Sequence, residues 1–271
     1  MGAILALTFV ALAVLIVFFA GSLRRYIRES LMQSVTSAHY QVLWPPGASS
    51  PDAMRQFALQ RESLFVALDR KLNDTASNRE IRVILDPNFR ATPAEAGKAQ
   101  PYDVTGTTIR SELNGAVPQL DPAADAESML YAAWGKPGNA LIAQWTARWL
   151  VGEWQGEELG MAAASVEQRL GHKKVATLLG QPPEEISSSQ DRALLGAAWI
   201  NAVAELSGPA EVRNLYSERR SKTDVAEVTK TLGTTSTELE RKWQMWMYAY
   251  IAGMPPASHT MKMPMDMPMS K

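Results

Sequence analysis

The chain has 271 residues, which is enough for one membrane anchor plus one sizeable domain or two small ones. Its 27 basic and 28 acidic residues give a formal net charge of −1, so no basic excess indicates a nucleic-acid partner. The absence of cysteine excludes disulfides, thiolate zinc sites, iron–sulfur clusters and a cysteine nucleophile.

The N-terminus carries an apolar run long enough to cross a membrane. Residues 3–20 read AILALTFVALAVLIVFFA without a charge, and Arg24, Arg25 and Arg28 follow. About 20 helical residues cross a hydrocarbon core of roughly 30 Å. A cleaved signal peptide would begin with positive charge and have a shorter apolar core of about 7–15 residues. We therefore expect a retained single-pass anchor over residues 1–23 in the cell membrane.

A small sheet is predicted after a juxtamembrane connector over residues 24–38. The run HYQVLW (39–44) is typical of a strand, and Pro45-Pro46-Gly47 ends it. Apolar residues then recur at helical spacing after Pro51. Further strands are predicted over residues 80–86, 106–113 and 116–121. The last of these is expected at a sheet edge because it contains Pro118.

From Ala123 onward the pattern is helical. Breaks are predicted at residues 135–138, 180–183, 208–209 and 233. Thr235 and Glu238 have the spacing of a capping box ahead of the last helix. We therefore predict an α+β fold, in which residues 39–122 form a small mixed sheet with helices and residues 123–253 form a mostly helical lobe.

The order of these elements and the run AESMLYAAWGKPGNALIAQWTARWLVGEW, which begins at Ala126, resemble gluzincin-type (peptidase MA-like) metallopeptidases. In that family an edge strand leads into a helix carrying H-E-x-x-H. A second helix then carries a Trp-Leu pair and a glutamate ligand. The runs WINAVAELSGPAEVRNLYSE and DVAEVTKTLGTTSTELERKWQMW resemble the C-terminal lobe of the family. The resemblance covers approximately residues 40–247 and implies a gluzincin-like fold.

Laid on the family pattern, this sequence lacks the zinc ligands. Ala126 and Leu130 take the two histidine positions, and Glu127 takes the position of the general base. The third ligand position falls on Gly152 if Trp149-Leu150 match the family pair, or on Arg148 if Trp145 is the matching tryptophan. A register that places AQWTA (143–147) on the motif also lacks both histidines.

These replacements remove the chemistry of the motif. H-E-x-x-H binds zinc because residues i and i+4 share one helix face, so two imidazoles reach the metal while the glutamate polarises its water. Alanine, leucine and glycine side chains offer no donor atom, and arginine repels a dication. The three histidines, His39, His172 and His259, are far apart in the sequence. We therefore expect no bound zinc, no cofactor, no catalytic residue and an inactive metallopeptidase homologue.

Two alternatives stay open: a plain helical domain without this ancestry, and an active hydrolase with atypical ligands. Whether the chain is an inactive peptidase homologue or a plain helical domain, Glu127 and Arg148 are opposite charges on helices expected to face each other. We therefore hypothesise a salt bridge between them, in place of the metal.

The C-terminal tail, residues 254–271, is rich in methionine. Its members are His259, Met261, Met263, Met265, Met267 and Met269. Thioether sulfur suits Cu(I), so one interpretation is a copper-binding envelope protein, and truncation at Met254 is then expected to abolish Cu(I) binding. The other is an extended tail that docks on a partner, because methionine adapts to irregular apolar surfaces.

The function expected from the sequence is that of a non-catalytic, membrane-anchored pseudo-peptidase domain. It would serve as a structural or binding subunit, a scaffold, in a membrane protein complex, with the membrane and other subunits as partners and no nucleic acid. An energy-transducing assembly, respiratory or photosynthetic, is one such host. The arginines after the anchor favour a cytoplasmic domain. The envelope location of the family favours a periplasmic one, and we expect the latter.

Overall fold

The structure is a computed structural model that describes residues 28–73, 75–76, 79–89, 102–113, 118, 121–180, 186, 188–218 and 224–253. The predicted anchor over residues 1–23 and the methionine-rich tail over residues 254–271 lie outside the described residues. Across the described ranges, no helix is both long and apolar enough to cross a membrane.

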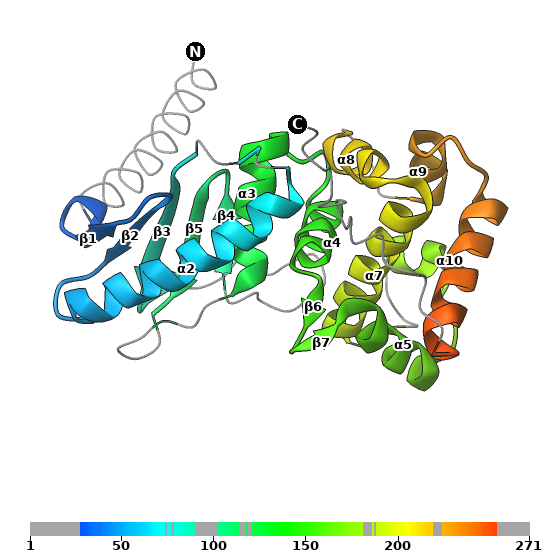
Figure 1. Cartoon of the computed structure of the whole chain (residues 1–271), viewed down its shortest axis with the longest axis horizontal. Helices are drawn as coiled ribbons and strands as arrows, with labels where there is room; N and C mark the ends of the chain where they lie inside the picture. Colours follow the sequence, from blue (N-terminus) through cyan, green and yellow to red (C-terminus); the bar gives the residue numbers. More distant parts are fainter. Residues whose placement is uncertain are drawn as a thin grey trace, which may run out of the picture.

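A five-stranded mixed sheet lies at one end of the described chain (Figure 1). In spatial order its strands are β1 (Gln33–Thr36), β2 (Tyr40–Trp44), β3 (Ile81–Asp86), β5 (Thr108–Glu112) and β4 (Tyr102–Thr105). The three central strands are parallel, and the two edge strands are antiparallel to their neighbours. One row of β-branched residues crosses all five strands: Val35, Val42, Val83, Ile109 and Val104. Because such side chains pack well on a pleated surface, this row fixes the register of the sheet.

Two helices cover one side of the sheet. Helix α2 (Pro51–Lys71) begins where the Ser50 hydroxyl accepts a hydrogen bond from the Ala53 amide at 3.1 Å. It packs on β1 and β2, while helix α3 (Pro122–Trp134) packs on β4 and β5 (Figure 1). The apolar side chains of the sheet, α2, α3 and part of α4 form one core cluster, the sheet cluster.

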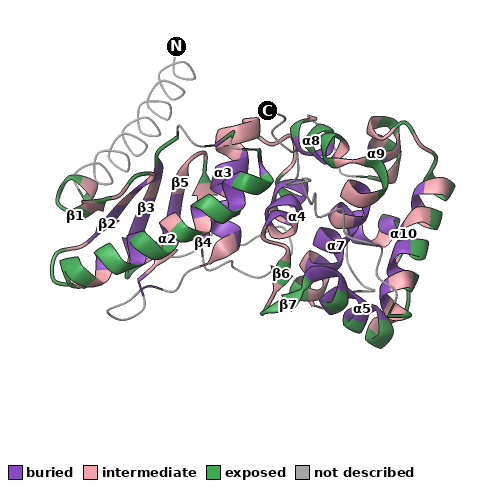
Figure 2. Cartoon of the chain, in the orientation of Figure 1, coloured by how far each residue is buried: buried purple, intermediate pink, exposed green. Residues whose placement is uncertain are grey.

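The rest of the described chain is mostly helical. Its helices are α4 (Ala140–Val151), α5 (Leu159–Leu170), α6 (Val175–Leu179), α7 (Ser189–Ser207), α8 (Pro209–Ser217), α9 (Val225–Thr231) and α10 (Ser236–Ile251). Helix α7 packs against α4, α5, α8 and α10, and Figure 2 shows buried residues along it. At Gly196 an added Cβ would stand 2.1 Å from Cε2 of Trp145, so glycine lets α4 and α7 approach closely. These helices form a second core cluster around Trp145, Trp199 and Trp243.

The predicted α+β plan is confirmed, but several of its details are wrong. Residues 33–36, expected within the connector, pair with β2 as strand β1. Strand β4 was not predicted. The expected continuous helical run is interrupted by a hairpin of β6 (Glu153–Trp154) and β7 (Glu157–Glu158), because Gly152 ends α4 in the left-handed region. Most of the strand predicted over residues 116–121 lies outside the described residues.

The first described residues are tied to the sheet by ion pairs. Residues 28–30 are helical. Arg28 pairs with Asp86 at 2.9 Å, and the Glu29 carboxylate bridges Arg110 at 2.6 Å and Arg82 at 3.1 Å. The chain therefore enters the sheet domain through contacts with β3 and β5.

Candidate functional site

Helices α3 and α4 position the residues that the sequence aligns with the zinc motif. The Asp121 side chain caps α3 through the Ala123 amide at 3.0 Å, and Pro122 occupies the first turn. Asn139 caps α4 through the Leu141 amide at 2.9 Å. The two helices pack against each other, and each ends at a glycine with positive φ. The segment between them is therefore a tight connection between two facing helices.

The two residues that align with the histidines of the zinc motif belong to the sheet cluster. Ala126 and Leu130 are each 0% exposed. They share this cluster with Ala143 and Ala147, which come from α4. Because both positions are filled by apolar side chains packed inside the protein, they contribute to stability and offer no ligand atom to a metal.

Gly152, one candidate for the third ligand position, ends α4. Its φ of +82° is a left-handed conformation that glycine adopts without strain, and its amide donates to the Arg148 carbonyl at 3.1 Å. The Lys71 ammonium donates to the Leu150 and Val151 carbonyls at 2.8 and 2.9 Å, so a cation caps the same helix end. The position now serves helix termination.

Glu127 aligns with the general base of the zinc motif, and its environment is unusual. The side chain is half-buried, and burial raises the pKa of its carboxyl to about 7. The negative charges of Asp103 and Asp121 contribute to this raised pKa of about 7, whereas Arg148 opposes the rise. Glu127 therefore changes its charge near neutral pH, as a general acid or base would, but it lies beside helix positions that hold no metal ligand.

The hypothesised pairing of Glu127 with Arg148 is seen only as an attraction across space, which lowers the pKa of the Glu127 carboxyl. Among the described residues, no ion pair within 4.0 Å joins these two side chains. The Arg148 guanidinium instead lies over the ring of Trp154, with Cζ 4.8 Å from the ring centroid. The hairpin that follows Gly152 supplies this ring, so the arginine is stacked and influences Glu127 only across space.

A cleft opens beside the first turn of α3. Its volume is about 430 Å³. Its wall includes Asp121, Pro122, Arg148, Glu153, Trp154 and Gln190. We call this hollow the Arg148 cleft. It combines a stacked guanidinium, an aromatic ring and carboxylates, which suits recognition of a polar chain more than the activation of water.

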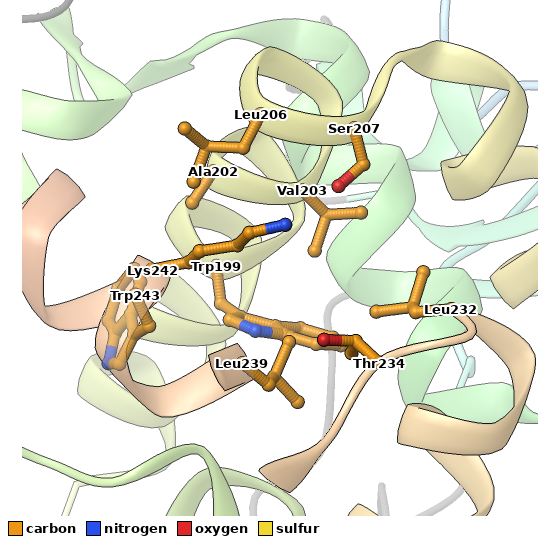
Figure 3. Close-up of a pocket in the computed structure, with 10 residues that line it drawn as sticks. All are labelled: Trp199, Ala202, Val203, Leu206, Ser207, Leu232, Thr234, Leu239, Lys242 and Trp243. Carbon is orange, nitrogen blue, oxygen red and sulfur yellow. The ribbon is translucent and has the colours of Figure 1, made fainter. Parts of the chain in front are cut away.

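A second, smaller hollow lies in the helical lobe between α7 and α10 (Figure 3). Its volume is about 30 Å³, and the rings of Trp199 and Trp243 line it with apolar side chains. Lys242 extends across it in Figure 3. This smaller hollow is lined by no residue of α3 or α4, so it is separate from the residues that align with the zinc motif.

The two described histidines are engaged by carboxylates. His39 Nδ1 lies 2.7 Å from Glu62 Oε2, and the His39 ring stacks on Phe65. His172 lies between Glu167 and Glu240. His259 and the tail methionines proposed to bind copper lie outside the described residues. Within the ranges that the structure covers, no group of three or more His, Asp or Glu side chains is arranged to hold a metal ion.

Sequence reasoning missed Lys71, Trp154 and Asp103. Lys71 and Asp103 act across long sequence separations, so no local pattern pointed to them. Trp154 had a signal that was not used, because glycine commonly ends a helix and Gly152 directly precedes the Glu153-Trp154 pair.

Comparison with known proteins finds similar folds among solved structures. No protein-family model and no curated protein matches the sequence. The fold is similar to the M1 zinc metallopeptidase from Deinococcus radiodurans, with 18% identity and a TM-score of 0.40. A mutant of an M1 zinc metallopeptidase from the same organism, bound to a Tyr-Ser-Ala substrate, gives 17% identity and the same TM-score. In both cases the match covers 83% of this chain and 52% of the other, so this chain spans about half their length.

Proposed function

We propose that the chain is a non-catalytic, gluzincin-like domain that acts as a structural or protein-binding subunit of a membrane complex. One observation supports the proposal: the residues that align with the zinc ligands pack in the core or end a helix. Ala126 and Leu130 lie in the sheet cluster, and Gly152 ends α4 beside Lys71. A glutamate base without a metal-bound water lacks the nucleophile that this class of peptidase uses.

The Arg148 cleft supports a binding role. Its stacked arginine and tryptophan are the residue types that most often carry binding energy at protein interfaces. A hollow of about 430 Å³ is large enough to receive side chains of a partner polypeptide. The apolar run at residues 3–20 supports attachment to the membrane. The proposed periplasmic side follows from the resemblance to envelope proteins, and an energy-transducing assembly is one candidate host.

The test uses the full chain in its native membrane. The protein is extracted in mild detergent and separated on a native gel, and co-migrating proteins are identified by mass spectrometry. We expect stable co-migration with a large membrane complex. Migration alone near the monomer mass would overturn the proposal.

Two charge reversals locate the interface. Arg148→Glu alters the cleft, whereas Arg213→Glu makes the same change at an exposed position of α8. We expect Arg148→Glu to reduce co-migration and Arg213→Glu to leave it unchanged. Equal behaviour of the two variants would place the interface elsewhere on the domain.

A further inference from the structure

His172 lies between two carboxylates that come from different helices. It belongs to the connection between α5 and α6, residues 171–174. Its Nδ1 is 2.5 Å from Glu167 Oε1, and its Nε2 is 2.9 Å from Glu240 Oε1. Glu167 lies on α5 and Glu240 on α10, so one imidazole ring links both helices to the connection.

Counting hydrogens shows that this arrangement holds an extra proton. Each of the two nitrogen–oxygen contacts needs one hydrogen, and a neutral imidazole carries only one N–H. The second hydrogen must reside on the ring, making it imidazolium, or on one of the carboxyls. Without it, a ring lone pair would face a carboxylate oxygen. The Glu167 side chain is 3% exposed, and its burial raises the pKa of this carboxyl, which favours retention of the proton.

The same carboxylates hold the backbone of the connection. The Lys173 amide donates to Glu167 Oε1 at 3.1 Å, and the Val175 amide donates to Glu240 Oε2 at 3.0 Å. The indole N–H of Trp243 donates to the Lys173 carbonyl at 2.9 Å. Movement of either carboxylate would therefore break a hydrogen bond to the main chain of the connection.

Two of the arginines on the surrounding elements pair with other carboxylates, whereas Lys173 attracts Glu167 and lowers the pKa of its carboxyl. Arg169 of α5 pairs with Asp191 of α7, and Arg241 of α10 pairs with Glu238. Lys173 and Lys174 lie on the connection itself. Helix α6 has no titratable side chain.

We propose that His172, Glu167 and Glu240 form a pH-sensitive clamp that holds residues 171–174 between α5 and α10. The clamp is closed while the extra proton is bound, which is the state at lower pH. It opens as pH rises and the proton is released. This inference is independent of the proposed function.

Amide hydrogen exchange of the full chain in detergent tests the clamp. Protection factors are measured at a series of pH values on both sides of neutrality and are corrected for intrinsic exchange. Over the pH range in which the closed state still holds the proton and the open state has lost it, we expect protection of the Lys173 and Val175 amides to fall by about tenfold per pH unit, because opening then releases one proton. Protection that does not change with pH would overturn the proposal.

Two variants and one control test whether the clamp causes the pH dependence. His172→Gln removes the imidazole ring, and Glu240→Gln gives the ring a neutral partner whose amide can donate to it. Both should abolish the pH dependence, and Glu240→Gln decides the question if His172→Gln fails to fold. His39→Gln is the matched control, because His39 contacts one carboxyl group, that of Glu62, so a neutral ring satisfies its contact. This control should keep the full pH dependence. Retention of the pH dependence in Glu240→Gln would contradict the clamp.

Discussion

The Lys71 ammonium lies 3.2 Å from the point at which a Cβ on Gly152 would stand. Lys71 belongs to α2 and Gly152 ends α4, so the contact joins elements that are distant in the sequence. In the register that matches Trp149-Leu150 to the family pair, Gly152 is where a zinc peptidase would carry a glutamate. Here that space adjoins a cation that caps a helix, so a side chain would disturb both the backbone conformation and the cap.

Gly152→Ala tests this packing directly. The left-handed backbone costs a non-glycine residue about 1–2 kcal/mol, and displacement of Lys71 adds to this cost. Gly156→Ala is the matched control, because its φ of +84° is similar and an added Cβ there meets nothing within 4 Å. We expect denaturant unfolding to show a larger loss of stability for Gly152→Ala. Equal losses would show that Lys71 does not fill the position.

Rebuilding the two histidines should harm the protein. Ala126→His with Leu130→His places larger or polar side chains inside a packed cluster, and each overpacking change costs about 1–3 kcal/mol. We expect a markedly lower melting temperature and no recovery when zinc is added. A zinc-dependent rise in the melting temperature of this double variant would contradict the account.

Glu127 should make stability depend on pH in a defined window. The pKa of its carboxyl is raised from 4.5 to about 7 by burial, so the folded state holds this proton more tightly than the unfolded state. Its contribution to stability is present below about pH 4.5, falls as pH rises, and is lost above about pH 7, by at most about 3 kcal/mol.

Glu127→Gln should remove this fall, so that the variant matches the wild type at pH 4.5 and is more stable at pH 8. Glu157→Gln, on the exposed hairpin, is the control and should keep the wild-type profile. Urea unfolding across this range provides the measurement. Identical profiles for the wild type and Glu127→Gln would refute the prediction.

The buried ion pair between α2 and α3 should be strongly coupled. Arg61 Nη1 lies 2.6 Å from Asp125 Oδ1, and the two side chains are 1% and 0% exposed. Arg61→Met leaves an uncompensated buried charge and should cost about 3–5 kcal/mol, whereas the double variant with Asp125→Asn should lose less than the sum of the single changes. The exposed pair Arg55–Asp52 is the control, and Arg55→Met should cost less than about 1 kcal/mol. Additive losses would show that Arg61 and Asp125 are not coupled.

Much of the fold was predictable because strong local signals agree with tertiary packing. The strand over 81–86, the helix from Pro51 and the capping of α10 by Thr235 follow the predicted pattern. Strand β1 was not predictable, because its four residues contain one apolar side chain and depend on pairing with β2. The hairpin β6–β7 has two residues in each strand, which is too short to give a periodic signal.

The sequence was enough to predict which residues make up the candidate site, but not which of their side chains touch one another. The sequence places Ala126, Leu130 and Glu127 on one helix, and the structure keeps them there. The contact of Arg148 depends on where the chain goes after Gly152. The hairpin returns beside α4 and places the Trp154 ring against the Arg148 guanidinium. The negative charge of Glu127 was therefore not enough to predict the contact of Arg148.

The central claim is the proposal that the positions aligned with the zinc ligands serve packing and helix termination and bind no metal. The most direct measurement is the zinc content of the untagged full chain, purified in the presence of zinc and analysed by mass spectrometry of metals alongside a peptidase assay. The account predicts substoichiometric zinc and no hydrolysis. One zinc per chain, together with peptide hydrolysis that a chelator abolishes, would contradict it.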